Sequence, residues 1–327
     1  LQRCLELDPL DARANLALGK SALRRGLFST AQKYLENSIA RLTSRHPNPV
    51  TGEAHYHLGL CLRFQGHDQS AYDFFYKATW NYEWRSSAYY QLATLDCLRK
   101  DYDSALEHLD QALATNRDHN KARTLTALAL QQFGKTDEAG KQLAELSSVD
   151  ALDHWATHVS GDIEKFLSGS RNDAQTILDL VFDYTEAGFR AEAIGLLELH
   201  HKHPVTPCAV PNPLQTNQMT RYAKAWLSGD PGDLAEARAQ SSDHFFPSRL
   251  HEQIILEWAL AQPGEDPLAA YALGNYYYDL KRHRDALGMW RIAANVGNPQ
   301  AHRNLGLALW NIERDGKGAR ASYLTAI

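Results

Sequence analysis

The feature of this sequence that most constrains its fold is a pattern that recurs every 34 residues between Gly52 and about Ser147. Three positions of the pattern keep the same residue type, and the second and third follow the first by 12 and 16 residues. The three columns are Gly59, Ala93 and Ala127; Ala71, Ala105 and Ala139; and Phe75, Leu109 and Leu143. A unit of this length cannot bury its own apolar residues alone, so the pattern predicts a stack of similar units.

A small residue, an Ala twelve positions later and an apolar residue four further on is the pattern of the tetratricopeptide repeat. In the unit Ser86–Arg117, Tyr89, Leu92 and Ala93 share one face of a first helix, A, and Ala105 and Leu109 share one face of a second helix, B. The sequence therefore predicts an all-α fold, a tetratricopeptide-repeat superhelix (α-solenoid) of antiparallel helix pairs. A recurring glycine between A and B predicts a left-handed turn there. These glycines are Gly26, Gly66, Gly134 and Gly188.

Further units flank the regular stretch. Ala12–Leu42 fits the pattern, followed by a longer proline-containing loop, whereas Ser147–Asp173 breaks the period and predicts a shortened helix pair. Two regular units close the chain, the last with one extra residue in its Glu313–Lys317 turn. We expect capping boxes at Ser29–Gln32 and at Asp233–Glu236, and a cap from Asn172-Asp173.

Proline divides the predicted array. Pro207, Pro211 and Pro213 forbid a regular helix and predict a corner or hinge. The predicted organisation is an N-terminal repeat array at 1–204, the corner at 205–213 and C-terminal helical repeats at 214–327.

Composition excludes several classes of partner. The net charge of −5 and the lack of a basic block argue against nucleic acid, and no apolar run is long enough to cross a membrane. The cysteines Cys4, Cys61, Cys97 and Cys208 have no paired spacing, which favours free thiols and a cytoplasmic location. Because both ends fall within the repeat pattern, we expect the chain to be an excerpt of a longer protein.

Aromatic segments carry a family resemblance. Phe74–Trp84, Phe246–Leu250 and Leu273–Tyr278 are dense in aromatic residues. From about Gly52 to its end, the chain resembles the C-terminal region of bacterial proteins of unknown function, in which a galactose-mutarotase-like β-sandwich domain precedes tetratricopeptide repeats. The resemblance implies a large parent protein in carbohydrate metabolism, with any sugar chemistry upstream of this chain. It implies no catalytic residue at any position here.

The candidate chemistry is weak. His154 and His158, with Asp162 four residues on, have a spacing that can place metal ligands on one helix face, but a structural role is favoured. His200, His201 and His203 are interpreted as charged caps at a helix C-terminus. Asp101 and Asp103 are interpreted as helix caps. We therefore expect no metal and no cofactor, and since no catalytic constellation is present, enzymatic activity is left undecided.

The aromatic run Phe74–Trp84 has two interpretations. Packing between repeats accounts for Phe75 and Ala78, whereas a stacking platform for a sugar would need several exposed rings. Packing is favoured, and Trp80, Tyr82 and Trp84 are the residues it explains least.

The inner face of the A helices is the predicted partner-binding groove, rich in aromatic and apolar residues. By repeat position it contains Tyr56, Leu60, Arg63, Tyr90, Thr94, Cys97, Leu128, Gln131, Tyr271, Asn275 and Tyr278, with Thr124 among them. The Lys and Asn set that clamps a terminal carboxylate in some repeats of this kind is missing.

The favoured function is a protein-interaction and scaffolding module that holds another domain of its own chain or a second subunit. Whether the chain forms a homo-oligomer is left open. The alternative is a wall-forming part of a carbohydrate-active enzyme whose catalytic domain lies upstream.

Overall fold

The computed structural model describes residues 1–203 and 217–327, and every regular element in them is a helix. They form two compact units: unit 1 is Leu1–Arg171 with Asp183–Arg190, and unit 2 is Asn172–Phe182 with Ala191–Ile327. The predicted corner at 205–213 lies outside the described residues, so the division into 1–204 and 214–327 stays a prediction.

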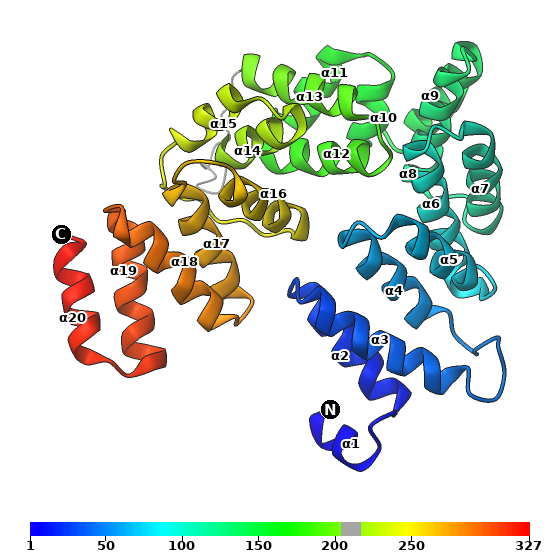
Figure 1. The fold of residues 1–327 in the computed structure, drawn as a ribbon. Coiled ribbons are helices and arrows are strands. Elements are labelled where there is room, and N and C mark those ends of the chain that lie inside the picture. The colour runs from blue at the N-terminus through cyan, green and yellow to red at the C-terminus, as the bar shows by residue number, and fades with distance from the viewer. Residues whose placement is uncertain (204–216) are drawn as a thin grey trace. The chain divides into compact units, whose positions relative to one another are not determined.

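Unit 1 consists of consecutive helices that pack as pairs (Figure 1). Their bounds are α1 (Gln2–Leu7), α2 (Ala12–Arg24), α3 (Phe28–Leu42), α4 (Glu53–Phe64), α5 (Asp68–Ala78), α6 (Tyr82–Leu98), α7 (Tyr102–Thr115), α8 (Asn120–Gln132), α9 (Thr136–Val149), α10 (His154–Val159), α11 (Ile163–Ser170) and α12 (Ala174–Glu186), whose last residues alone belong to this unit. The predicted pairs α2–α3, α4–α5, α6–α7 and α8–α9 are confirmed, as is the shortened pair α10–α11.

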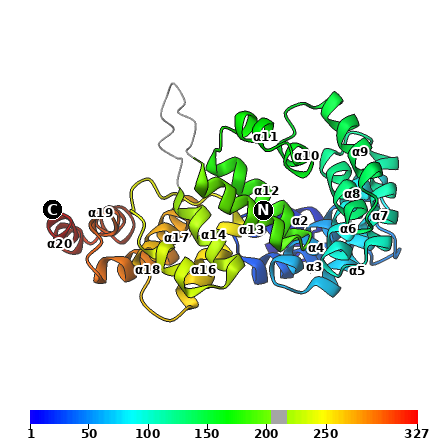
Figure 2. The ribbon, with the colours of Figure 1, turned by 90° about the horizontal axis from the view of Figure 1, so that it is seen from above.

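Unit 2 ends in two further pairs, α17–α18 and α19–α20, which lie next to each other in Figure 2. The bounds are α13 (Arg190–Lys202), α14 (Asn217–Ser228), α15 (Pro231–Arg238), α16 (Leu250–Ala261), α17 (Pro267–Asp279), α18 (His283–Asn295), α19 (Pro299–Ala308), the π-helix η1 (Leu309–Glu313) and α20 (Gly316–Thr325). The extra residue of the last repeat was expected in the Glu313–Lys317 turn, and this is wrong. It lies in η1, where the wider turn of a π-helix accommodates it.

Helices A and B touch where a small residue faces a large one. A Cβ built on Gly59 of α4 would lie 2.6 Å from Cε1 of Phe75 in α5, and one on Gly274 of α17 would lie 2.3 Å from Cδ1 of Trp290 in α18. Both distances are too short for a carbon contact, so glycine is needed opposite these large rings. Gly19 lies opposite Leu35 in the same way, and the repeats with Ala in the first column, at Ala93 and Ala127, have Leu109 and Leu143 in the third column.

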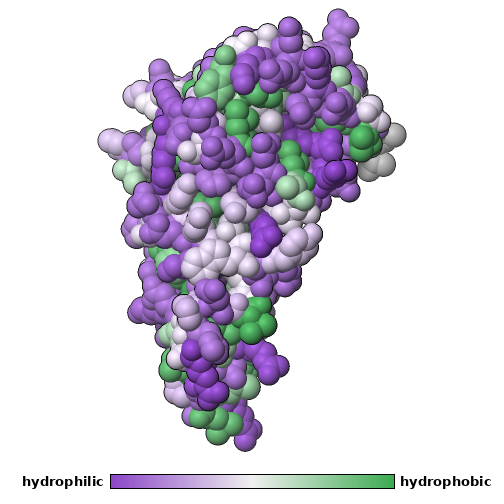
Figure 3. Space-filling view, turned by 90° about the vertical axis from the view of Figure 1, so that its right-hand side faces the viewer, coloured by the Kyte–Doolittle hydropathy of each residue, from purple (hydrophilic) through white to green (hydrophobic). Residues whose placement is uncertain are grey.

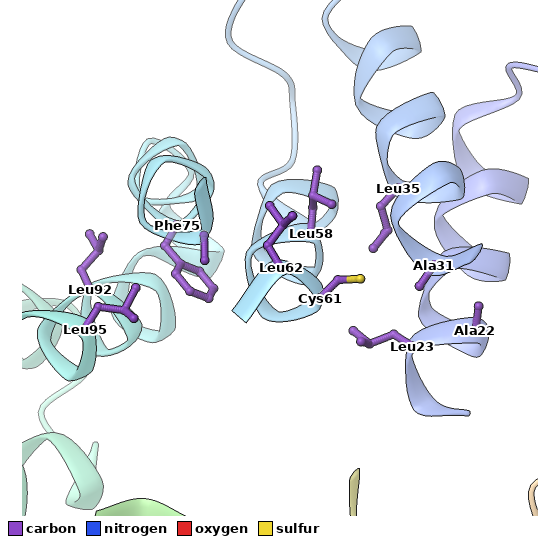
Figure 4. Close-up of a cluster of buried hydrophobic side chains, with 11 residues drawn as sticks. Ala22, Leu23, Ala31, Leu35, Leu58, Cys61, Leu62, Phe75, Leu92 and Leu95 are labelled. Atoms are coloured by element: carbon purple, nitrogen blue, oxygen red, sulfur yellow. The ribbon is translucent and has the colours of Figure 1, made fainter. Parts of the chain in front are cut away.

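Among α2 to α6, these contacts merge into one buried apolar cluster. Figure 4 shows Leu35 of α3, Leu58 of α4, Phe75 of α5 and Leu92 of α6 as parts of one buried cluster. The second and third repeat columns are buried throughout, and Ala105 has no exposed surface, as predicted. Each helix pair is thus stabilised by the core that it shares with its neighbours.

The predicted left-handed glycines between A and B are confirmed: φ is +66° at Gly26, +75° at Gly66, +71° at Gly134 and +81° at Gly188. Lys100 and Lys281 occupy the same position in their repeats, with φ of +62° and +60°. The turn therefore persists where the sequence has no glycine to signal it.

The two predicted capping boxes are wrong. Helix α3 begins at Phe28 with Leu27 as its N-cap, and α15 begins at Pro231 with Asp230 as its N-cap. In α15, proline at the first position and the Asp230 side chain, which accepts from Gly232 N, start the helix two residues earlier than expected. The caps expected from Asp101 and Asp173 are confirmed, since they accept from Ser104 N and Thr176 N.

Only part of the aromatic run Phe74–Trp84 packs against the repeats, and Tyr76 within it is exposed. Phe75 and Ala78 are fully buried, and the ring centroid of Trp84 lies 4.9 Å from that of Tyr56. Trp80 and Tyr82, by contrast, are exposed. The packing interpretation is therefore confirmed for Phe75, Ala78 and Trp84 only.

The surface is mixed. The face shown in Figure 3 is mostly hydrophilic, with hydrophobic residues in small scattered groups. Within the part of the chain that the structure describes, none of the helices combines the length and apolar character needed to span a bilayer.

The small-to-large contact can be tested at Gly59. We expect Gly59→Ala to destabilise the chain by about 1–3 kcal/mol, because the new methyl group overlaps Phe75. The double change Gly59→Ala with Phe75→Leu should recover part of this loss, because it recreates the Ala93–Leu109 pairing. Urea unfolding midpoints measure both effects.

A matched control is Gly140→Ala in α9, where a Cβ would meet nothing within 4 Å. Removing this helix-interior glycine should leave stability equal or raise it by about 0.5–1 kcal/mol. Equal midpoints for Gly59→Ala and wild type would contradict the proposed packing.

Candidate functional site

The inner face of unit 1 is formed by helices A of three successive repeats, α4, α6 and α8. Its predicted groove residues are less open than expected: Tyr90, Thr94, Cys97 and Leu128 are buried, whereas Tyr56, Leu60, Arg63 and Gln131 are half-buried. Thr124 is also buried. Part of what covers this face is the chain itself.

Residues 183–190, here called the inner segment, comprise the end of α12 and the turn that follows. Lys121 Nζ of α8 lies 2.6 Å from Asp183 Oδ1. The Phe189 ring stacks on that of Tyr102, with centroids 6.5 Å apart. Gly188 has a φ of +81°, and a Cβ there would lie 2.8 Å from Cα of Leu98. Both its backbone angle and its contact with α6 therefore require glycine.

Arg63 of α4 connects this inner segment to the repeats. Its guanidinium donates hydrogen bonds to Gln91 Oε1 (2.5 Å) and Thr94 Oγ1 (2.7 Å) of α6, and to the main-chain oxygen of Glu186 (2.5 Å). Its Nη1 lies 3.7 Å from Glu186 Oε2, and its side chain is only 11% exposed. The last carbonyls of a helix lack intrahelical donors and carry partial negative charge, so a buried cation stabilises the end of α12.

Tyrosines on the same face are neutral packing residues. Burial, and then the nearby carboxylates of Asp183 and Glu186, raise the pKa of Tyr90 well above its ordinary value. Burial also raises the pKa of Tyr56 to about 12. Tyr56 contacts Trp84 and Phe75, so it packs within and between repeats. The contact of both tyrosines with a separate partner stays a prediction.

His158 of α10 has a partner within the inner segment. Its Nδ1 lies 2.7 Å from the Tyr184 hydroxyl, and burial lowers its pKa to about 4. Asp162, considered above as a metal ligand, caps α11 by accepting from Lys165 N. Among the residues that the structure describes, no three His, Cys, Asp or Glu side chains are grouped so as to hold a metal ion.

The histidines at the end of α13 were interpreted as charged caps, and this is wrong for His201. Its Nε2 lies 3.1 Å from Thr220 Oγ1, and burial, followed by the charge of Arg221, lowers its pKa to about 3. The cap is instead Asn172, whose amide donates to the main-chain oxygens of His200 (3.0 Å) and His203 (2.8 Å). A neutral amide satisfies these carbonyls without the cost of burying a charge.

Unit 2 has an inner face on α17, where Tyr271 is buried and Asn275 and Tyr278 are half-buried. Asn275 Nδ2 donates to the main-chain oxygen of Phe245 (3.1 Å), and its Oδ1 accepts from Trp290 Nε1 (3.2 Å) and Asn304 Nδ2 (2.9 Å). The two bonds to the oxygen fix the amide so that its N–H points at the connection between α15 and α16.

This connection, residues 239–249, is held at both ends. Phe245 is fully buried and stacks on Tyr222, and Gln218 Nε2 donates to the main-chain oxygen of Asp243 (3.1 Å). Towards α16, the main-chain N–H groups of Ser248 and Arg249 donate to Glu252 Oε2. The connection is thus a fixed wall.

A cavity of about 410 Å³ lies between this wall, α17 and the start of α12. It is lined by Gln175, His244, Phe246, Pro247, Ser248, Asn275 and Asp279. Of these, only Asn275 was predicted as a site residue. The others lie outside the repeat columns, and the one sequence signal for them was the aromatic segment Phe246–Leu250.

The two units share one arrangement. In each, a polar side chain on the inner face of a helix A donates an N–H to a main-chain oxygen outside its own repeat: Arg63 to Glu186, and Asn275 to Phe245. Such bonds recognise a backbone and are independent of the side chain at the bound position.

Replacing Arg63 should release the inner segment. We expect Arg63→Met, which keeps the aliphatic stem, to lower stability by about 1–3 kcal/mol, because it leaves buried acceptors without donors. Hydrogen exchange in peptides that cover 183–190 should accelerate. The control is Lys121→Met, whose side chain is 55% exposed and whose loss should cost at most about 1 kcal/mol. Unchanged exchange in Arg63→Met would contradict the assigned role.

His158 should make stability depend on pH. Because its folded-state pKa of about 4 lies below the ordinary 6.5, the unfolded chain binds a proton first as the pH falls. Stability is therefore lost between pH 6.5 and 4, by as much as about 3 kcal/mol from this group. His158→Gln should make this loss smaller in urea unfolding, whereas Tyr184→Phe should keep it, because burial is the cause. Equal pH dependence of His158→Gln and wild type would show the assignment to be wrong.

Comparison with known proteins agrees with this architecture. Two sequence profiles described as tetratricopeptide repeat match the chain, one over residues 98–157 and the other over residues 16–87 and 271–327. Among solved structures, the MamA protein is similar at 24% identity over 45% of this chain and 77% of that chain, with a TM-score of 0.40.

Two further structures are similar over more of the chain. YrrB, titled a TPR protein with an unusual peptide-binding site, shares 18% identity over 62% of this chain and 90% of its own, with a TM-score of 0.41. A tetratricopeptide repeat protein from Parabacteroides merdae shares 13% identity over 96% and 98%, also at 0.41. The family assignment rests on the repeat profiles and the helix pairs, and it makes this chain a tetratricopeptide-repeat α-solenoid, an architecture of protein-interaction and scaffolding modules.

Proposed function

We propose that the chain holds a polypeptide partner against the inner face of α17 in unit 2, at Tyr271, Asn275, Tyr278 and the adjoining cavity. The partner is another domain of the same chain or a second subunit. The observation that carries this proposal is the fixed Asn275 amide, bonded to a main-chain oxygen, beside a 410 Å³ cavity where the Phe246 side chain is 48% exposed. An exposed ring at a cavity beside the inner face of a helix A suits an extended peptide.

The inner face of unit 1 has a different part in this proposal. Its groove residues hold the chain's own inner segment. They are Tyr56, Leu60, Arg63, Tyr90, Thr94, Cys97, Leu128 and Gln131. Support comes from the contacts of Arg63 and Lys121 with Glu186 and Asp183.

The family resemblance suggests which domain the partner is. A galactose-mutarotase-like β-sandwich upstream of the chain would place the occupant in the same polypeptide. The described cysteines, Cys4, Cys61 and Cys97, are free thiols, which fits the reducing cytoplasm. The comparisons add no support for the alternative, a wall of a carbohydrate-active enzyme.

Selection from a random-peptide display library tests the proposal. We expect peptides that bind the chain in fluorescence anisotropy, with Phe246→Ala weakening binding by at least about tenfold, a loss of about 1.4 kcal/mol. The control is Ile292→Ala in α18, also a half-exposed apolar residue but outside the cavity lining, which should bind as wild type does. Failure to enrich peptides, or equal binding by Phe246→Ala, would contradict the proposal.

A further inference from the structure

We propose that the cavity beside α17 takes a basic side chain, arginine or lysine, of the polypeptide partner, with Asp279 as its counter-charge. This inference rests on the proposed function and adds the chemistry of the partner. Three observations support it: the position of Asp279, the apolar walls of the cavity, and the ion pairs that the nearby arginines already form.

Asp279 is a carboxylate in an unfavourable place. It is the last residue of α17, where the helix dipole is negative, and no basic residue lies in that last turn. It is exposed, lines the cavity and forms no ion pair with any other described residue. A bound cation would therefore relieve the repulsion between this carboxylate and the end of the helix.

The arginine that bonds to the cavity lining is already paired, and so is Arg282 just after α17, whose Nε lies 2.7 Å from Asp285 Oδ2. Arg249 Nε lies 2.7 Å from Asp179 Oδ1, and its Nη1 lies 3.0 Å from Glu252 Oε1. Arg249 Nη2 also donates to the main-chain oxygen of Gln175, a residue of the cavity lining (3.2 Å). An acidic ligand would meet the carboxylate of Asp279, whereas a basic ligand meets a carboxylate that has no ion pair among the described residues.

The walls suit the stem of a basic side chain. Phe246 and Pro247 offer apolar surface. Arginine and lysine bury an aliphatic stem while the charged head stays at a polar edge, and a cation is attracted to an aromatic face. The chemistry of the cavity thus matches a long cationic side chain better than a short or purely apolar one.

The peptides selected above provide the experiment. We expect one position to be arginine or lysine, and its change to glutamate to weaken binding at least about tenfold in fluorescence anisotropy. Asp279→Asn should weaken the basic peptide similarly, and Asp279→Lys should bind the glutamate peptide better than wild type does. Glu265→Gln, an exposed carboxylate outside the cavity lining, is the matched control and should bind as wild type does.

The outcomes separate the two proposals. Thermal unfolding of each variant confirms that the chain is folded. If peptides bind in a manner sensitive to Phe246→Ala but show no basic position, or bind Asp279→Asn as tightly as wild type, the basic-side-chain inference is overturned while the proposed function stands. If no peptide binds, both are overturned.

Discussion

The structure depends on close approach of the two helices within each repeat, which requires a small residue on helix A opposite a large one on helix B. Gly59 against Phe75 and Gly274 against Trp290 leave no room for a methyl group. This contact sets the spacing of the helices, and the spacing in turn lets each pair share a core with the next. The 34-residue period of the sequence is a consequence of this packing, because each repeat must pack one surface against the repeat before it and another against the repeat after it.

Packing of this kind uses only part of each helix A and leaves its inner face for other contacts. Arg63 and Asn275 lie on inner faces, and each donates to a main-chain oxygen outside its own repeat. Side chains on regular helices can be positioned accurately, so they suit this task. We interpret these two segments as extensions of the scaffold: residues 183–190 cover an inner face, and residues 239–249 form the wall of a cavity.

The sequence predicted the features that recur. The helix pairs, the buried columns and the left-handed glycines were correct because each is required in every repeat. Features that occur once were missed: Asn172 as the cap at the end of α13, η1 as the place of the extra residue, and the cover that residues 183–190 provide. These depend on contacts between residues far apart in the chain, such as Arg63 and Glu186, for which a single sequence has no periodic signal. The loop that lines the cavity was visible only as an aromatic segment.

The central claim is that the inner face of unit 1 holds the chain's own inner segment, and zero-length carbodiimide cross-linking tests it most directly. Lys121 Nζ lies 2.6 Å from Asp183 Oδ1, a separation that permits an amide cross-link between α8 and α12. Lys224 and Asp233, 2.7 Å apart in neighbouring helices of unit 2, are the internal control. The account predicts that mass spectrometry of the cross-linked monomer will detect both pairs. Detection of the Lys224–Asp233 link without the Lys121–Asp183 link would contradict it.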